Sequence, residues 1–251
     1  MAVACGEHHT AVVTEHGQLW ACGAGDKGAL GLTALEHQRV PAFVGGLEMF
    51  GAPIVMIAAG QHHSAALAAD GAVWTWGRGV DGALGHGDRA ARPTPTRLGK
   101  EAFGESAAVM VACGHEHTMV VTEDGELWTC GESFALGHGD YADRLVPTRV
   151  GAGRFGGAKI AMVAAGSLHS IAVTTEGAVW TFGSSASRAL GHNDEEDRMV
   201  PAQIDGKVFG GSPVVMVAAG GFYSVAVTAE GVLFSWGKGG DGQLGLGNTD
   251  N

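Results

Sequence analysis

Several short stretches of the sequence combine residue types that bind metals or act as nucleophiles. Segment 4–10, ACGEHHT, places a thiol, a carboxylate and two imidazoles within seven residues. Cys and His are the usual zinc ligands, and a Cys beside a His is a common activated nucleophile. A second set, Cys113, His115 and His117, alternates along its segment, so on a strand its side chains would share one face. A zinc site and a nucleophile with its base are therefore both alternatives to test.

A third stretch, GAGDKG, has glycines in the spacing of the dinucleotide-binding fingerprint. The same spacing occurs at Gly23, Gly25 and Gly28, at Gly77, Gly79 and Gly82, and at Gly237, Gly239 and Gly242. The fingerprint requires a helix that opens immediately and points its N-terminus at the pyrophosphate. Each of these copies runs instead into Leu-Gly, and the corresponding segments GESFALG and GSSASRALG lack the spacing. We predict turns here, and no cofactor.

The chain repeats one pattern five times, and this decides how the candidate sites are interpreted. ACGEHHTAVVTEHGQLWACG returns as AAGQHHSAALAADGAVWTWG and in three further versions. The first glycines of these segments lie 52 to 54 residues apart, at Gly6, Gly60, Gly114, Gly166 and Gly220. A fixed period of this length is typical of solenoids and propellers.

Side chains that recur at one place in each unit are predicted to be architectural. His9 returns as His63, His117 and His169, and Tyr223 takes its place in the fifth unit. We expect each imidazole to hydrogen-bond within its own unit. The four cysteines occupy positions that hold Ala or large apolar residues in other units, which predicts core positions. Zinc held by Cys113, His115 and His117 remains the minor alternative.

Each unit is predicted to form about four β-strands. Segments such as HTAVVT and QLWAC are short, rich in Val, Thr and aromatic residues, and joined by a turn that ends in Gly. Segments like VPAFV and IVMIAA supply two more. Trp20 and its counterparts Trp74, Trp128, Trp180 and Phe234 alternate with aliphatic residues, so both faces of each sheet are apolar. Sheets covered on both faces and repeated at a fixed interval predict an all-β propeller of stacked blades.

The pattern Gly-x-x-His-[Ser/Thr], Asp-Gly-x-Leu-Trp-x-x-Gly, Leu-Gly-x-Gly-Asp and Val-Pro resembles the regulator of chromosome condensation repeat family. The resemblance covers nearly all of the chain and implies a propeller whose full members usually have seven blades. We therefore expect one repeat domain over residues 1–251, with units that start near 3, 57, 111, 163 and 217 and an incomplete last unit. Five units predict either a ring that closes differently or an arc or fragment of a seven-bladed ring, and we expect the latter.

Composition narrows the classes of partner. The formal net charge is −11, which disfavours binding to a nucleic-acid backbone. No apolar run has the length that spans a bilayer and no secretory leader opens the chain, so we expect no membrane insertion. Four cysteines are too few for a disulfide scaffold, and we expect an intracellular protein, cytoplasmic or nuclear, that is not secreted.

Positions that differ between units are free of the architectural constraint, and there we expect a protein partner to bind. They are the two residues after each first glycine, the turn after the Trp strand, and the charged loop after Leu-Gly. The candidate partner-binding residues are Asp26, Lys27, Arg78, Asp81, Arg89, Arg92, Asp140, Tyr141, Asp194, Glu195, Glu196 and Asp197. Besides the five glycines and the His or Tyr positions given above, the residues predicted to be structural are Trp20, Trp74, Trp128, Trp180 and Trp236.

We predict a non-catalytic interaction scaffold with no metal, cofactor or catalytic residue. The resemblance implies two alternatives: a guanine-nucleotide exchange factor for a small Ran-like GTPase with chromatin association, and the partner-binding propeller of a larger HECT-type ubiquitin ligase. Exchange in the founding member relies on an inserted β-wedge, for which the near-uniform spacing leaves no room. Light-sensing members use Trp and Arg after the first glycine, where this chain has pairs such as Glu7-His8, so light sensing is not expected.

Overall fold

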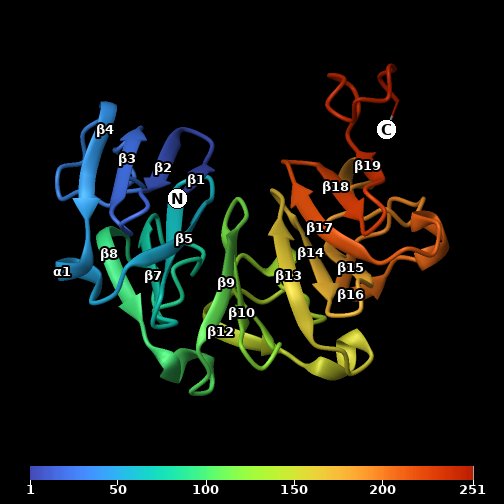
Figure 1. Ribbon diagram of the computed structural model, residues 1–251, viewed down its shortest axis with the longest axis horizontal. Helices are drawn as coiled ribbons and strands as arrows, with labels where there is room; N and C mark the ends of the chain where they lie inside the picture. Colours follow the sequence, from blue (N-terminus) through green and yellow to red (C-terminus); the bar gives the residue numbers. More distant parts are fainter. Residues whose placement is uncertain (251) are drawn as a thin grey trace.

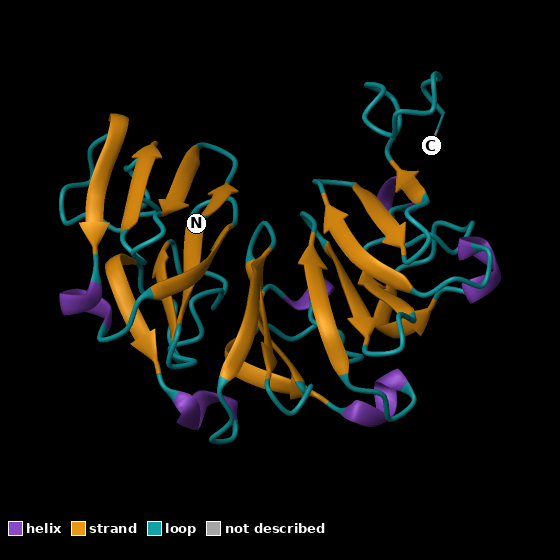
Figure 2. Ribbon diagram, viewed as in Figure 1, coloured by secondary structure: helices purple, strands orange, loops and turns teal. Residues whose placement is uncertain are grey.

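The computed structural model describes residues 1–250 as five antiparallel sheets joined by loops and short helical turns (Figure 2). We call the sheets blades 1 to 5, and within each blade the strands pair in chain order. The innermost strands are β1 (Ala2–Cys5), β5 (Ile54–Ala59), β9 (Ala108–Cys113), β13 (Ile160–Ala165) and β17 (Val214–Ala219). The second strands are β2 (His9–Val13), β6 (His63–Ala68), β10 (His117–Thr122), β14 (His169–Thr174) and β18 (Tyr223–Thr228).

The outer half of each blade follows the same order. The third strands are β3 (Leu19–Gly23), β7 (Val73–Gly77), β11 (Leu127–Gly131), β15 (Val179–Gly183) and β19 (Leu233–Gly237). The outermost are β4 (Gln38–Gly45), β8 (Arg92–Leu98), β12 (Arg144–Val150) and β16 (Arg198–Gln203). Short helices are α1 (Leu47–Phe50), η1 (Lys100–Phe103), η2 (Ser133–Ala135), η3 (Ala152–Phe155), η4 (Ala186–Arg188) and η5 (Gly206–Phe209). Among residues 1–250, every helix is too short to span a membrane.

The blades succeed one another along an arc that is open between blades 1 and 5 (Figure 1). Strands β1, β5, β9, β13 and β17 pack against one another in sequence and line the inside of this arc. The prediction of an all-β, propeller-type architecture is confirmed. The four predicted strands are present in blades 1 to 4, whereas blade 5 has three within the described residues.

The glycine-rich segments form turns, as the sequence predicts. Gly71 closes the hairpin between β6 and β7 at φ +81°, and a Cβ atom there would lie 2.6 Å from Cβ of Ala107. The fingerprint-like segment after β3 forms turns with no helix at Gly25, and Gly28 has φ +78°. These positions need a residue without a side chain because L-residues rarely adopt positive φ.

Aromatic side chains join consecutive blades. Phe103 of η1, which follows blade 2, packs edge-on against Trp128 of blade 3 with ring centroids 6.1 Å apart. The same arrangement joins Phe50 to Trp74, Phe155 to Trp180 and Phe209 to Phe234. The largest fully buried ring is Trp76, whose Nε1 donates to the carbonyl of Ala29 in blade 1 at 2.9 Å. Trp236 repeats this bond to Ala189.

The outward faces of the two end blades have no neighbour among the described residues. Val3 of blade 1 is 66% exposed, although its counterpart Val111 in blade 3 is 3% exposed. At the other end, Leu233 of blade 5 is 65% exposed while its counterpart Leu127 is 1% exposed. Burial of these apolar positions therefore depends on the adjacent blade.

Candidate functional site

The recurring histidines link neighbouring blades. His63 Nε2 lies 3.0 Å from Oγ1 of Thr118, and that hydroxyl donates to the carbonyl of Ala83 in blade 2. Because the hydroxyl hydrogen is used on the carbonyl, the imidazole Nε2 must donate to the hydroxyl. The same links join His9 to Ser64, His117 to Ser170 and His169 to Ser224. The architectural role fits, but the expectation of bonding within one unit is wrong: the stacking of blades places the next unit's hydroxyl in reach.

The first glycine of each unit makes room for this imidazole. A Cβ atom on Gly114 would overlap Cε1 of His117 and the carbonyl oxygen of Gly166. Gly6, Gly60 and Gly166 lie equally close to the rings of their own units, and Gly220 lies close to Tyr223. These residues are thus part of the packing between blades.

The cysteines and histidines of the two opening motifs do not converge on one centre. Among residues 1–250, no group of three or more His, Cys, Asp or Glu side chains is arranged to hold a metal ion. Burial raises the pKa of the Cys113 thiol to about 12, so it is protonated at neutral pH. Cys130 is buried, as predicted, but the prediction of a core position is wrong for Cys5, which is exposed because β1 lines the hollow of the arc.

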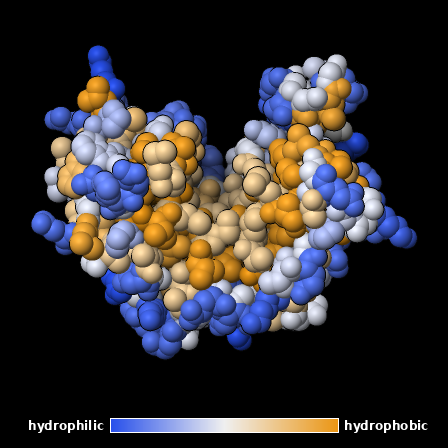
Figure 3. Space-filling view, in the orientation of Figure 1, coloured by the Kyte–Doolittle hydropathy of each residue, from blue (hydrophilic) through white to orange (hydrophobic). Residues whose placement is uncertain are grey.

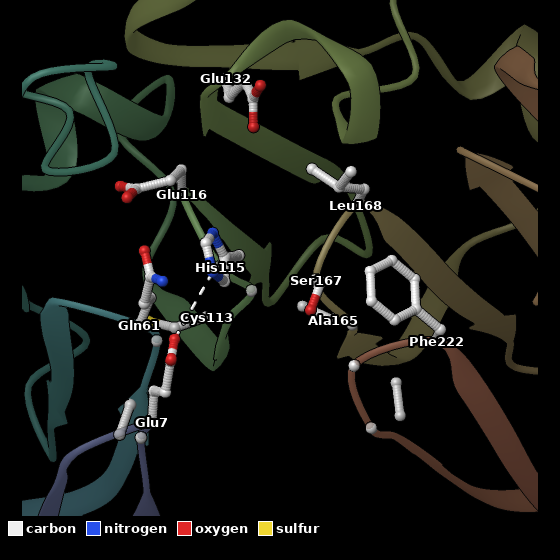
Figure 4. A pocket seen from close by; sticks show the side chains of 18 of the residues that line it. Glu7, Gln61, Cys113, His115, Glu116, Glu132, Ala165, Ser167, Leu168 and Phe222 are labelled. Atoms are coloured by element: carbon white, nitrogen blue, oxygen red, sulfur yellow. Dashed lines mark ion pairs between the residues drawn. The ribbon is translucent and has the colours of Figure 1, made fainter. Parts of the chain in front are cut away.

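The residues that follow each first glycine converge on a pocket of about 920 Å³ inside the arc. Their loops join the first and second strands of the blades, on the inner side of the arc (Figure 1). We call this the axial pocket; the loop side chains that line it are Glu7, Gln61, His115, Glu116, Ser167, Leu168 and Phe222 (Figure 4). The hollow between the two ends of the arc has a largely apolar floor and more polar surroundings (Figure 3).

A second set of loops reaches the same pocket. Arg78 and Asp81, both predicted to bind a partner, lie in the loop after β7, and Glu132 follows β11. Arg78 donates to Oε1 of Glu116 at 3.1 Å. Two of the three variable sets in the sequence therefore meet at one place.

The acidic side of the pocket carries perturbed carboxyl groups. Burial raises the pKa of Glu116 to about 7, and Asp81 and Glu132 add to the rise while Arg78 opposes it. The pKa of Glu132 is also raised, mainly by burial and then by Asp81 and Asp143. The pocket thus holds acidic groups that its own cations only partly neutralise.

Glu7, which also lines the pocket, is a half-exposed carboxylate with polar neighbours. A hydrogen bond from Gln61 is the main cause that lowers the pKa of Glu7, with His8 and His115 contributing. Its carboxylate lies 3.3 Å from Nε2 of His8 and 3.6 Å from Nε2 of His115, the contact marked in Figure 4. This charge is therefore already shared with neighbours on blades 1 to 3.

Most predicted residues of the outer loops are paired inside the chain. Arg92 and Asp88, Arg144 and Asp140, and Arg198 and Asp194 form equivalent ion pairs at 2.9, 2.7 and 2.8 Å. Arg89 bonds Asp143 of blade 3 at 2.8 Å, Asp197 accepts from the amide of Ser185, and Glu195 lies 3.7 Å from Arg188. These charges are therefore used in pairs within one loop or between adjacent blades. Whether the loops bind a partner stays a prediction.

The remaining predicted residues lie outside the axial pocket. Asp26 and Lys27 pair with each other at 3.2 Å. Tyr141 is 69% exposed and packs against Phe134. The carboxylate of Glu196 accepts no hydrogen bond from another side chain of the described residues, whereas its backbone carbonyl accepts one from Arg198. Glu7, Glu116, Leu168 and Phe222 were not among the candidates named by number, but they belong to the variable positions after each first glycine, where the sequence predicts partner binding.

Comparison with known proteins gives consistent matches. A family model described as the RCC1-like domain matches residues 1–251. Ultraviolet-B receptor UVR8 of Arabidopsis thaliana is 38% identical over 252 residues, which covers 99% of this chain and 56% of the receptor. Human E3 ubiquitin-protein ligase HERC2 is 34% identical over 98% of this chain, which corresponds to 5% of the ligase.

Solved structures show the same architecture. Human WBSCR16 has a TM-score of 0.83 at 24% identity, covering 91% of this chain and 57% of that one. Prp20p from Saccharomyces cerevisiae has a TM-score of 0.74 at 26% identity, covering 90% of this chain and 55% of that one. The chain thus spans little more than half of each of these proteins.

Proposed function

The chain belongs to the RCC1-like domain family, and we propose that it is a non-catalytic module that binds a protein partner at the axial pocket. The observation that carries the proposal is the convergence of side chains that differ between units on one cavity, while the framework around them repeats. Variable loops on a repeated scaffold are where binding residues concentrate. Family relatives include an E3 ubiquitin ligase, in which such a domain is one part of a longer chain.

The non-catalytic part of the proposal is supported by the roles of the reactive residue types. The four recurring imidazoles hydrogen-bond to hydroxyl groups of the next blade and so link blades 1 to 5. The Cys113 thiol is protonated. We also propose an intracellular location, cytoplasmic or nuclear, which the four cysteines support because none of them forms a disulfide. Ultraviolet sensing is not proposed, since Glu7-His8 and the equivalent pairs lack the Trp and Arg of light-sensing members.

Copurification of the partner with variants of this chain tests the site. Leu168→Ala with Phe222→Ala removes apolar contacts from the pocket, and Val146→Ala with Val200→Ala removes exposed apolar groups from β12 and β16. We expect the pocket variant to lose at least about tenfold of the captured partner, as for contacts at a binding centre, and the control to retain it. Retention by the pocket variant, with loss on charge reversal at Arg89, Arg92, Glu195 and Glu196, would place the partner on the outer loops.

Nucleotide exchange is the second candidate because the similar Prp20p structure is described with that protein's binding to Gsp1p and histones. The near-uniform spacing of the units, 52 to 54 residues, leaves no room for the inserted wedge that the family resemblance implies for exchange. We therefore propose no exchange activity. Stimulated release of labelled GDP from a Ran-type GTPase by this chain would overturn that proposal.

A further inference from the structure

The axial pocket has two chemically different sides. Asp81, Glu116 and Glu132 come from loops of blades 2 and 3, whereas Leu168 and Phe222 come from blades 4 and 5. Figure 4 shows Glu116 and Glu132 across the cavity from Leu168 and Phe222. Phe222 is 37% exposed, so its ring is available to a partner. A segment bound here would meet acidic groups on one side and apolar groups on the other.

Glu116 shows that the acidic side lacks a donor. Its side chain is 8% exposed, and Oε1 accepts a hydrogen bond from a single nitrogen of Arg78. Oε2 is buried and has no hydrogen-bond partner among the described residues. A buried carboxylate oxygen without a donor is costly, because it has lost water and gained nothing in exchange. A cation bound in the pocket would reduce that cost through its charge, without contacting the buried oxygen.

The balance of charge selects the sign of the bound group. Asp81 and Glu132 raise the pKa of Glu116, and Asp81 and Asp143 raise the pKa of Glu132, with Arg78 as the cation that opposes the rise at Glu116. A second cation would be attracted and would relieve the repulsion, whereas an anion would add to it. A metal ion is a poorer candidate, because no cluster with metal-binding geometry occurs among residues 1–250.

We propose that the axial pocket receives a protein segment carrying a Lys or Arg side chain next to an apolar side chain. The cationic group lies among Asp81, Glu116 and Glu132, and the apolar side chain packs on Leu168 and Phe222. This inference rests on the proposed function and names the chemistry of its partner. Long cationic side chains suit such a place, because their stems pack on apolar surface while their heads reach the carboxylates.

Capped peptides test the proposal on the intact chain. Four probes share one Leu-Phe flank and differ only at a neighbouring position, which is Arg, Lys, Gln or Glu, and their affinities are measured by fluorescence anisotropy. We expect the Arg and Lys peptides to bind at least about tenfold more tightly than the Glu peptide, with affinity that falls as salt is added. Equal binding of all four peptides, or preference for Glu, would overturn the inference.

Paired charge-removing variants place the site. Asp81→Asn with Glu132→Gln should weaken the Arg peptide about tenfold and leave the Gln peptide nearly unchanged. Glu123→Gln with Glu176→Gln changes the net charge equally at two exposed turns between the second and third strands of blades 3 and 4, and should weaken neither. An equal loss in both variants would mean a general effect of net charge and would overturn the inference.

Capture of the natural partner by the two pocket variants distinguishes the proposed function from the inference about the cationic segment. If Leu168→Ala with Phe222→Ala abolishes partner capture but Asp81→Asn with Glu132→Gln does not, the proposed function holds and the cationic segment is wrong. If neither variant changes capture, both proposals fail.

Discussion

His117 Nε2 lies 3.0 Å from Oγ of Ser170, which ties the first residue of β10 in blade 3 to the second residue of β14 in blade 4. The hydroxyl of Ser170 in turn donates a hydrogen bond to the carbonyl of Ala135 in blade 3, so hydrogen bonds are donated across the interface in both directions. Each side of the interface contributes one donor and one acceptor.

Removal of one such imidazole should destabilise the whole chain. We expect His117→Ala to lower the free energy of unfolding by about 2–4 kcal/mol, because it leaves a cavity and deprives Ser170 of its donor. His16→Ala, at an exposed turn, is the matched control and should change stability little. Denaturant titration measures both variants, and equal stabilities would contradict the bridging role.

Acid should weaken the same interfaces. Burial is the main cause that lowers the pKa of His63 and His117 to about 3, and of His9 and His169 to about 4, from 6.5. Between these values the unfolded chain binds more protons at these histidines than the folded chain, so their contribution to stability is complete above pH 6.5 and falls as the pH decreases. Each residue contributes about 1.4 kcal/mol per pH unit in that window.

Thermal unfolding across pH measures this dependence. The His117→Gln variant, which keeps a side-chain donor but does not titrate in this window, should show a shallower fall in melting temperature with acid than the native chain. A fall of unchanged slope in the variant would mean that other groups dominate acid unfolding.

Glu116 should show the opposite dependence. Its folded pKa, about 7, lies above the value of 4.5 expected without burial, so the folded chain binds more protons between them and stability falls as the pH rises. Glu116→Gln removes this loss, and its stability relative to the native chain should increase from pH 4.5 towards pH 7. Glu123→Gln is the exposed control, and a constant difference for Glu116→Gln would contradict the raised pKa.

The first glycines should tolerate no side chain. Gly114→Ala should cost at least about 2 kcal/mol, because its methyl group would collide with His117 and the carbonyl of Gly166. Gly153→Ala in η3 has no atom within 4 Å of the added Cβ and a φ outside the left-handed region, so it should be neutral or slightly stabilising. Comparable melting temperatures for the two variants would show that the residues around Gly114 can move to accept a methyl group.

Trp76 of blade 2 should contribute strongly to stability. It is fully buried and bonds Ala29, so Trp76→Ala should cost about 3–5 kcal/mol, whereas Trp20→Ala, at a half-buried position of blade 1, should cost less. Urea midpoints compare the two. A larger loss for Trp20→Ala would reverse this ranking.

Sequence reasoning predicted the strands and turns because five aligned copies show which features the backbone requires. The glycine at the end of each hairpin turn and the apolar alternation along QLWAC need no tertiary information. The hydrogen-bond partner of each histidine does require tertiary information. His63 is followed directly by Ser64, yet the hydroxyl that it binds belongs to Thr118, 55 residues away.

The candidate site was predicted only in part for a related reason. Arg78 and Asp81 were chosen for their variation, and the structure brings them to the pocket. Arg92 and Asp194 were chosen for their charge, but each has an opposite charge four residues away. Convergence of the first-glycine loops depends on the curvature of the arc, which no single unit encodes.

Within residues 1–250, the exposure of Val3 and Leu233 leaves the two ends of the arc without the contacts that the middle blades give one another. In an array held together by nearest-neighbour contacts, local opening starts where a neighbour is missing and moves inward. Backbone amides of β10 and β14 should therefore exchange their hydrogens most slowly and those of β18 and β19 fastest, so blade 5, which supplies Phe222 to the pocket, can adjust its shape without unfolding the rest.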